Sequence, residues 1–130
     1  MADLHVTVAG VDFSNPLIAA SGTFGFGREY NEFYPLSTLG GISSKGIANI
    51  AGNTPEEYCA MAEKLSDTNV DMLEMNISCP NVKEGGVQFG TSCIGVEQIT
   101  AAVRKHCTKP LMVKLSPNVT DIGDIAASAE

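Results

Sequence analysis

The sequence predicts an α/β fold assembled from parallel βα units, and two observations lead to that prediction. From residue 47 onward, apolar runs of strand length alternate with amphipathic segments of helix length. The apolar runs also carry a polar residue near their carboxyl ends: Ser21, Lys45, Asn49, Asn76 and Lys114. Because α/β folds place their active sites at the carboxyl ends of parallel strands, these residues are the first candidates for function.

The composition is that of one globular domain spanning residues 1–130. Hydrophobic residues make up 44% of the chain and charged residues 18%, which is an ordinary balance for a folded domain. The net charge of −7 argues against nucleic-acid binding and against attraction to anionic membranes. No apolar run approaches the roughly 20 residues of a membrane span, and the first ten residues do not resemble a signal peptide. We therefore expect a cytoplasmic protein.

The cysteine spacing argues against disulfide and metal chemistry. Cys59, Cys79, Cys93 and Cys107 are far apart and form no C-x-x-C pair, so neither a disulfide scaffold nor a zinc or iron–sulfur site is expected. Cys79 differs from the others because it follows a strand-like run directly and precedes a proline. Position alone leaves it as a buried filler, a ligand or an acid–base group.

The N-terminal part predicts a β-hairpin and two further strands. Residues 4–13 alternate apolar and polar side chains about an Ala-Gly turn, which is typical of a hairpin. Residues 15–21 predict a short buried strand, and residues 22–27 a glycine-rich loop. Residues 28–40 predict a short helix or an irregular connection, and residues 40–46 a second strand.

Residues 54–65 form the clearest predicted helix. Thr54 suits the N-cap, Pro55 suits the first helical position, and Glu57 completes a capping box. The apolar stripe of this helix consists of Tyr58, Met61, Ala62 and Leu65.

The remaining segments continue the alternation. The predicted strands are residues 47–52, 70–78 and 110–117, the predicted helices are residues 96–107 and 121–130, and residues 79–92 form a loop. In the middle strand, side chains alternate between two faces, with Leu73, Met75 and Ile77 on one and Glu74, Asn76 and Ser78 on the other.

One junction departs from this alternation. Only Gly46 and Ile47 separate the strand that ends near Lys45 from the stretch "ANIAG", whereas parallel neighbours need a crossover of about a dozen residues or more. Three explanations stay open: one long strand, an antiparallel pair, or the loss of a βα connection.

Several motifs together carry a family resemblance. The stretches "NPLIAASGTFGFGREY", "SSKG", "ANIAG", "EMNISCPNVKEGGVQFG" and "VKLSPNVTDI" closely resemble the catalytic subunit of bacterial class 1B dihydroorotate dehydrogenase, in that family's order. The resemblance implies a (β/α)8 TIM barrel that binds FMN and oxidises dihydroorotate to orotate in pyrimidine biosynthesis. It also implies a catalytic homodimer within a heterotetramer, whose electron-transfer subunit carries FAD and a [2Fe–2S] cluster and passes electrons to NAD.

Two departures from the family pattern shape the expected fold. A TIM barrel needs roughly 250 residues, and the family has a long insert, with a substrate-binding stretch, where this chain has Gly46 and Ile47. The family's last three strands, with their glycine-rich loops around the flavin phosphate, have no counterpart before Glu130. We therefore expect a partial TIM barrel of about the first five strands, with one βα connection missing and an N-terminal β-hairpin.

The resemblance assigns Cys79 as the catalytic base. It would remove the proton from C5 of dihydroorotate, and a hydride would leave C6 for the flavin. A thiol, whose pKa is ordinarily near 8.5, can do this once that pKa is lowered modestly. Cys59 and Cys107, on predicted helices, and Cys93, after the loop, are interpreted as inert.

The other candidates would hold the ligands. By resemblance, FMN contacts are expected from Ser21, Lys45, Gly46, Asn49, Asn76 and Lys114, and substrate contacts from Lys45, Asn76 and Asn81. Amides donate and accept hydrogen bonds at the edges of such rings, and a lysine stabilises the reduced, anionic flavin. Taken singly, each residue also has a plainer role, because strand-end lysines extend to water and an asparagine after a proline commonly forms a turn.

Two further features accompany these residues. The stretch "KEGGVQFG" resembles the loop that closes over substrate, with Gly85 and Gly86 giving it hinge freedom. Glu74 lies on the same side of its strand as Asn76 and is interpreted as a packing residue inside the barrel.

Two other functions stay open. The chain would be a non-catalytic fragment or a pseudoenzyme if the missing segments leave no flavin site, and visible flavin absorbance of the purified protein would decide this. It would instead be a related flavin barrel, such as dihydropyrimidine dehydrogenase, if it turned over dihydrouracil in preference to dihydroorotate.

Overall fold

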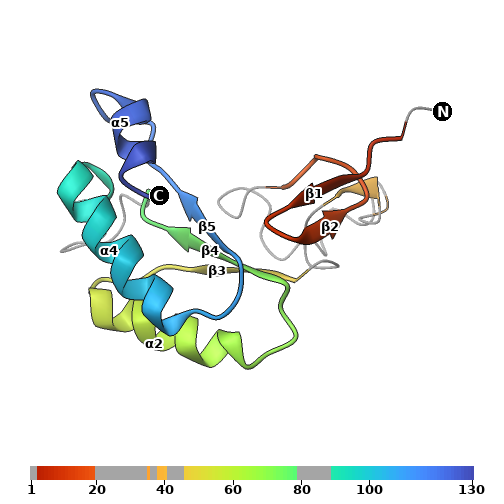
Figure 1. The fold of residues 1–130 in the computed structure, drawn as a ribbon, viewed down its shortest axis with the longest axis horizontal. Helices are drawn as coiled ribbons and strands as arrows, with labels where there is room; N and C mark the ends of the chain where they lie inside the picture. The colour runs from red at the N-terminus through yellow and green to blue at the C-terminus, as the bar shows by residue number, and fades with distance from the viewer. Residues whose placement is uncertain (1–2, 20–34, 36–37, 41–45, 79–88) are drawn as a thin grey trace.

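The computed structural model describes residues 3–19, 35, 38–40, 46–78 and 89–130. Its elements, in chain order, are β1 (Val6–Val8), β2 (Val11–Phe13), β3 (Ile47–Ile50), α2 (Pro55–Ser66), β4 (Met72–Asn76), α4 (Cys93–His106), β5 (Leu111–Lys114) and α5 (Ile122–Ala127). The first two strands form an antiparallel pair, and the other three form a parallel sheet in the order β3-β4-β5 (Figure 1). The predicted α/β class with an N-terminal hairpin is therefore confirmed.

The hairpin β1–β2 forms as the sequence predicts. Ala9 and Gly10 have φ angles of 50° and 79°, and two positive φ angles in a two-residue loop match the twist of the flanking strands. Across the pair, the Thr7 hydroxyl donates a hydrogen bond to Asp12 Oδ1 at 2.6 Å. Figure 1 shows this hairpin at one end of the molecule, away from α2 and α4.

The predicted buried strand over residues 15–21 is wrong in its burial for residues 15–19, the part that the structure describes, where Ile18 forms an isolated β-bridge. Leu17 and Ile18 are 62% and 40% exposed. Asn15 Oδ1 accepts a hydrogen bond from the Leu17 N–H at 3.0 Å, and an asparagine bonded to the backbone two residues on forms a turn in place of a strand. The predicted glycine-rich loop and the strand before Gly46 lie outside the described residues.

The two long helices begin at side-chain caps. In α2, Thr54 Oγ1 accepts from the Glu57 N–H at 3.3 Å, whereas the Glu57 carboxylate accepts from the N–H of Asn53 at 2.6 Å. The predicted capping box thus closes on the residue before the cap. Helix α4 begins at Cys93, earlier than predicted, because Ser92 Oγ accepts from the Gly95 N–H at 3.1 Å and so serves as the N-cap.

The hydrophobic core lies between one face of the parallel sheet and helices α2 and α4. Buried core residues are Ile50, Leu73, Met75 and Ile77 from the sheet and its continuation, Tyr58 and Ala62 from α2, and Val96, Ile99 and Val103 from α4. Since side chains alternate along a strand, the intervening residues of β3, β4 and β5 face the opposite side. We call that side the polar sheet face, and its members are Asn49, Glu74, Asn76 and Lys114, with the apolar residues Ile47, Met72 and Met112.

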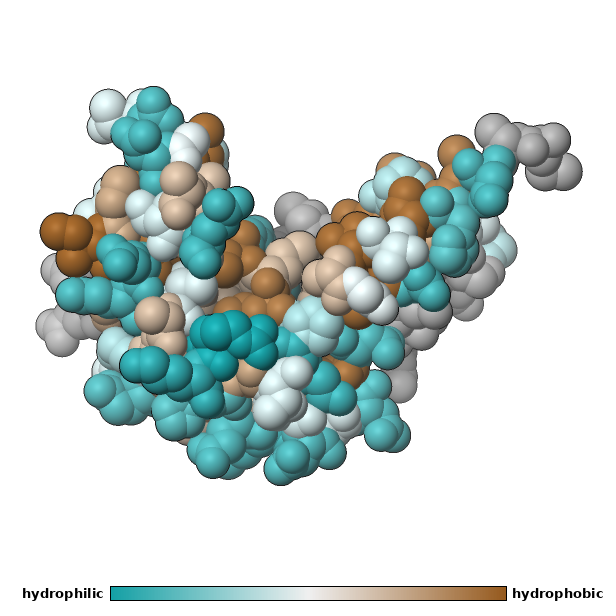
Figure 2. All heavy atoms as spheres, in the orientation of Figure 1, coloured by the Kyte–Doolittle hydropathy of each residue, from teal (hydrophilic) through white to brown (hydrophobic). Residues whose placement is uncertain are grey.

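The surface differs between the two ends of the molecule. Figure 2 shows hydrophilic side chains over the region of α2 and apolar ones on and beside the hairpin, where Leu4, Val8 and Leu17 are exposed. Among the described residues, no helix combines the length and the apolar content that crossing a bilayer would require.

Candidate functional site

Three of the predicted site residues come together on the polar sheet face. Asn49 lies in β3, Asn76 is the last residue of β4, and Lys114 is the last residue of β5. The register pairs Asn76 with Lys114 and Asn49 with Glu74. Paired residues on neighbouring strands are about 5 Å apart, so two amides, a carboxylate and an ammonium group lie side by side near the carboxyl ends of three parallel strands.

Glu74 is bonded to one of these amides. Asn49 Nδ2 donates to Glu74 Oε1 at 2.5 Å, and Glu74 is only 6% exposed. A carboxylate removed from water is costly unless hydrogen bonds or charges compensate it. The Asn49 amide supplies part of that compensation and is held in place in return.

Asn76 is held from two sides. Its carbonyl oxygen accepts a hydrogen bond from the Tyr58 hydroxyl of α2 at 2.8 Å. Its side-chain Oδ1 accepts from the Ser78 N–H at 3.1 Å and from the Ser78 hydroxyl at 2.7 Å. Both side-chain bonds use the oxygen, so the two bonds to Ser78 leave the Nδ2 hydrogens of Asn76 as the donors of this amide.

The chemistry of the polar sheet face follows from these groups. Lys114 is half-buried, and its positive charge lies on the strand beside Asn76, with which it is paired. Amides and an ammonium group can bond the oxygen and nitrogen edges of a planar ring and stabilise negative charge on it. Among the described residues, no cluster of three histidine, cysteine or acidic side chains is arranged to hold a metal ion.

Gly46 lies at the other end of the sheet. Its carbonyl oxygen accepts from the Asp71 N–H at 2.9 Å, just before β4 begins, and a Cβ on Gly46 would meet the Cα of Val70 at 3.0 Å. Gly46 precedes Asn49 by three residues, and at about 3.3 Å per residue this is a separation of roughly 10 Å along the strand. The structure therefore does not bring Gly46 together with Asn49, Asn76 and Lys114.

The other predicted site residues lie outside the described residues. These are Ser21, Lys45, Cys79 and Asn81, together with the loop glycines Gly85 and Gly86.

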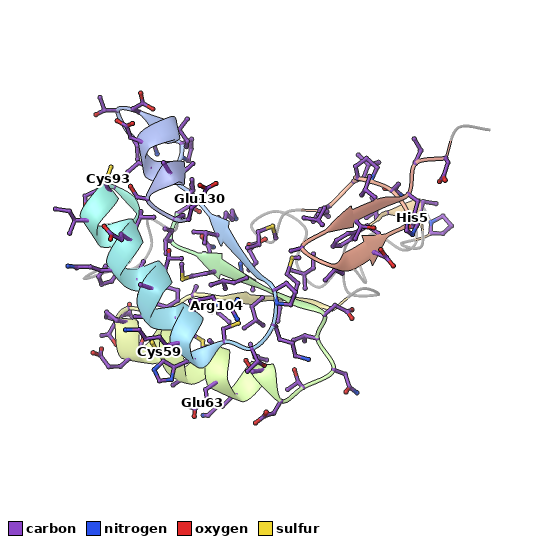
Figure 3. All side chains as sticks on the ribbon, viewed as in Figure 1. His5, Cys59, Glu63, Cys93, Arg104 and Glu130 are labelled. Carbon is purple, nitrogen blue, oxygen red and sulfur yellow. The ribbon has the colours of Figure 1, made fainter. Side chains whose placement is uncertain are left out.

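The three described cysteines belong to the helical layer. Figure 3 shows Cys59 on α2 and Cys93 at the start of α4, and Cys107 is buried where α4 ends. Burial raises the pKa of the Cys59 thiol above its usual value, and the nearby Glu56 carboxylate raises it further. None of these three thiols is on the polar sheet face.

Sequence reasoning missed the part that Tyr58 plays. The sequence places it in the apolar stripe of the helix, and its ring is indeed fully buried. A buried tyrosine usually finds a hydrogen-bond partner for its hydroxyl, so a tyrosine in a stripe that phenylalanine could fill was the available signal. The partner, the carbonyl of Asn76, depends on how α2 packs against β4 and is not encoded locally.

Comparison with known proteins identifies close relatives. A family model described as "Dihydroorotate dehydrogenase" matches residues 44–130. The chain is 41% identical to "Dihydroorotate dehydrogenase B (NAD(+)), catalytic subunit" of Petrotoga mobilis, over 98% of this chain and 59% of that protein. The proteins of the same name from Alkaliphilus metalliredigens and Phocaeicola vulgatus are 41% and 35% identical, over 98% and 100% of this chain and 59% and 60% of theirs.

The lengths of these matches carry further information. The chain spans about 59% of the length of the Petrotoga mobilis relative. That alignment is 178 positions long, whereas this chain has 130 residues, so at least 48 aligned positions have no residue here. The relative therefore has residues within the matched region that this sequence lacks.

Proposed function

The chain belongs to the dihydroorotate dehydrogenase family, and from that premise we propose that it carries part of an FMN site for the oxidation of dihydroorotate to orotate. The observation that supports this most is the meeting of Asn49, Asn76 and Lys114 on one sheet face. Each comes from a motif that resembles a flavin-binding stretch of the family. The parallel sheet with helices over its other face would be one arc of a TIM barrel.

The residues present fit a flavin ring. Both hydrogen bonds to Ser78 fix the Asn76 amide through its oxygen, and its Nδ2 would donate to the ring. Lys114 would place a positive charge beside the ring, where the reduced flavin is anionic. Asn49, bonded to Glu74, would contact the ring from β3. Ser21 and Lys45 are proposed as further contacts from the resemblance alone.

The chemistry divides between the cofactor and the chain. FMN, when bound, accepts the hydride that leaves the substrate. Cys79 would take the proton from the neighbouring carbon, as its position directly after Ser78 and the family motif suggest. Asn76 and Asn81 would orient the substrate ring, and Lys45 would lie near it, so that the carbon to be deprotonated faces the thiol.

The partner is also inferred from relatives. The names of the relatives call them the catalytic subunit of an NAD(+)-linked enzyme, which supports a second subunit for this chain as well. We expect that subunit to carry FAD and a [2Fe–2S] cluster and to pass electrons to NAD in the cytoplasm, with two catalytic subunits pairing in a heterotetramer. Orotate production would place the reaction in pyrimidine biosynthesis.

One observation favours a second candidate, a non-catalytic member of the family. At least 48 aligned positions of the relative have no counterpart here, and Gly46 lies at the opposite end of the sheet from the polar groups. A flavin site deprived of those contacts would bind FMN weakly or not at all.

Flavin titration of the purified chain separates these candidates. Quenching of FMN fluorescence, with a dissociation constant that rises at least threefold in Lys114→Ala, supports the flavin site, because an ammonium beside the ring contributes on the order of 1 kcal/mol. A matched control is Lys64→Ala, at the exposed end of α2. No quenching at any FMN concentration supports the non-catalytic candidate.

The chemistry can be tested in a chimera. Residues 46–130 would replace their counterpart in the Petrotoga mobilis relative, which supplies the segments that this chain lacks. The chimera should oxidise dihydroorotate in preference to dihydrouracil. Cys79→Ala should retain the flavin and lose about 10²–10⁴-fold in rate, the usual contribution of a general base. A variant that loses its flavin, or keeps its rate, contradicts the role given to Cys79.

A further inference from the structure

We propose that Glu74 is a positioning residue that fixes which way the amide of Asn49 faces. This inference rests on the proposed function, because Asn49 is one of the residues expected to contact FMN. It assigns Glu74 a task beyond packing the interior of the sheet.

The first support is the cost of placing a carboxylate here. Glu74 is buried, and Met72 and Met112 are its neighbours on the same face. An apolar side chain would fill this position without a desolvation penalty, and buried ionic groups are poor sources of stability. A residue kept at such a cost is a candidate for a directional role.

The second support is the chemistry of the Asn49 bond. An ionised carboxylate only accepts hydrogen bonds, whereas an amide has a donor end and an acceptor end. Asn49 must therefore turn its Nδ2 toward Glu74, as it does at 2.5 Å. Its carbonyl oxygen is then directed away from Glu74, so the bond fixes which end of the Asn49 amide turns to each side.

A glutamine at position 74 would no longer fix the orientation of the Asn49 amide. Glu74→Gln conserves the shape of the side chain, but its amide can accept from Asn49 Nδ2 or donate to Asn49 Oδ1. Asn49 would then occupy both orientations, and the oriented population available to FMN would fall. We expect the FMN dissociation constant to rise about three- to tenfold, the effect of one lost directional hydrogen bond.

The closing experiment combines flavin titration with NMR of the side-chain amides. Glu74→Gln should weaken FMN binding and split or shift the Asn49 amide resonance, whereas Glu63→Gln, the loss of one charge on the exposed side of α2 (Figure 3), should change neither. In an Asn49→Ala background, Glu74→Gln should have no further effect on FMN. Equal FMN affinity in Glu74→Gln, or an additive effect in the double variant, overturns the proposal.

The failure of the proposed function would look different. If the wild-type chain binds no FMN, the flavin site is refuted, and the Asn49 amide resonance still decides the role of Glu74. Should Glu74→Gln not fold, solvent exchange in the wild-type chain gives the same decision. The Asn49 side-chain amide should exchange more slowly than that of exposed Asn118, and equal rates overturn the inference.

Discussion

Tyr58→Phe removes one oxygen atom from the interior and isolates the hydrogen bond that anchors the end of β4. The tyrosine ring is fully buried, and its hydroxyl donates to the Asn76 carbonyl at 2.8 Å. Phenylalanine keeps the ring and its packing, so the lost free energy reports on the interactions of the hydroxyl, the bond to Asn76 among them.

The expected magnitude follows from the burial. A typical intramolecular hydrogen bond contributes about 1 kcal/mol to folding, and a buried acceptor left without its partner costs about 1–3 kcal/mol. We expect Tyr58→Phe to lower the free energy of unfolding by about 1.5 kcal/mol. The rest of the ring contributes more, so Tyr58→Ala should lose about 3–5 kcal/mol.

Urea unfolding followed by far-UV circular dichroism measures this change, with an unchanged dependence on urea as the sign that the denatured state is unaffected. Thr68→Val is the control, because it removes a hydroxyl that donates to the Leu65 carbonyl at an exposed position. That variant should stay within about 0.5 kcal/mol of the wild type. If Tyr58→Phe does the same, the hydroxyl does not anchor Asn76, and the account of how α2 supports the polar sheet face is refuted.

Three further outcomes are expected. Thr54→Ala removes the cap of α2 and should cost about 1 kcal/mol in the same urea assay; no loss would mean that the cap is dispensable. Gly90→Ala would put a Cβ 2.3 Å from the Ile77 carbonyl oxygen and should lower the urea midpoint more than Thr54→Ala does; an unshifted midpoint would contradict that contact. The raised pKa of Cys59 means that it should react with iodoacetamide more slowly than exposed Cys93 near neutral pH. Glu56→Gln should reduce this difference in reaction rate. Because folding raises the pKa of the Cys59 thiol, the thiol's small contribution to stability is present below the unfolded thiol's pKa and should be lost as pH rises through the folded thiol's pKa. If Cys59 reacts at the same rate in the wild type and in Glu56→Gln, the Glu56 carboxylate does not raise the pKa of the thiol.

Local signals predicted the elements well where they act within a few residues. The Ala9-Gly10 turn and the Thr54-Pro55 helix start both depend on backbone preferences of adjacent residues, and both are present. The start of α4 was misplaced because Ser92 competes with later positions for the N-cap, and the apolar pattern alone does not rank such caps.

Features that depend on distant parts of the chain are harder to predict from the sequence. Leu17 belongs to an apolar run, yet it is exposed, because a strand needs neighbours and the local bond to Asn15 competes with them. The alternation in β4 correctly separated Glu74 and Asn76 from the core side chains. The bond from Glu74 to Asn49 depends on the register of two strands, which no short stretch specifies.

The position of Gly46 bears on how binding residues are transferred from one sequence to another. When a binding role is assigned from an aligned relative, the residue type is matched, but its position along the strand is not compared. When a chain loses a whole βα connection, residues that once ended one strand are carried to the beginning of the next, at the opposite rim of the sheet. Gly46, whose carbonyl oxygen accepts from the Asp71 N–H just before β4, lies at this amino-end rim. Asn76 and Lys114 end neighbouring strands and are paired with each other, so transfer by alignment suits these residues better than it suits Gly46.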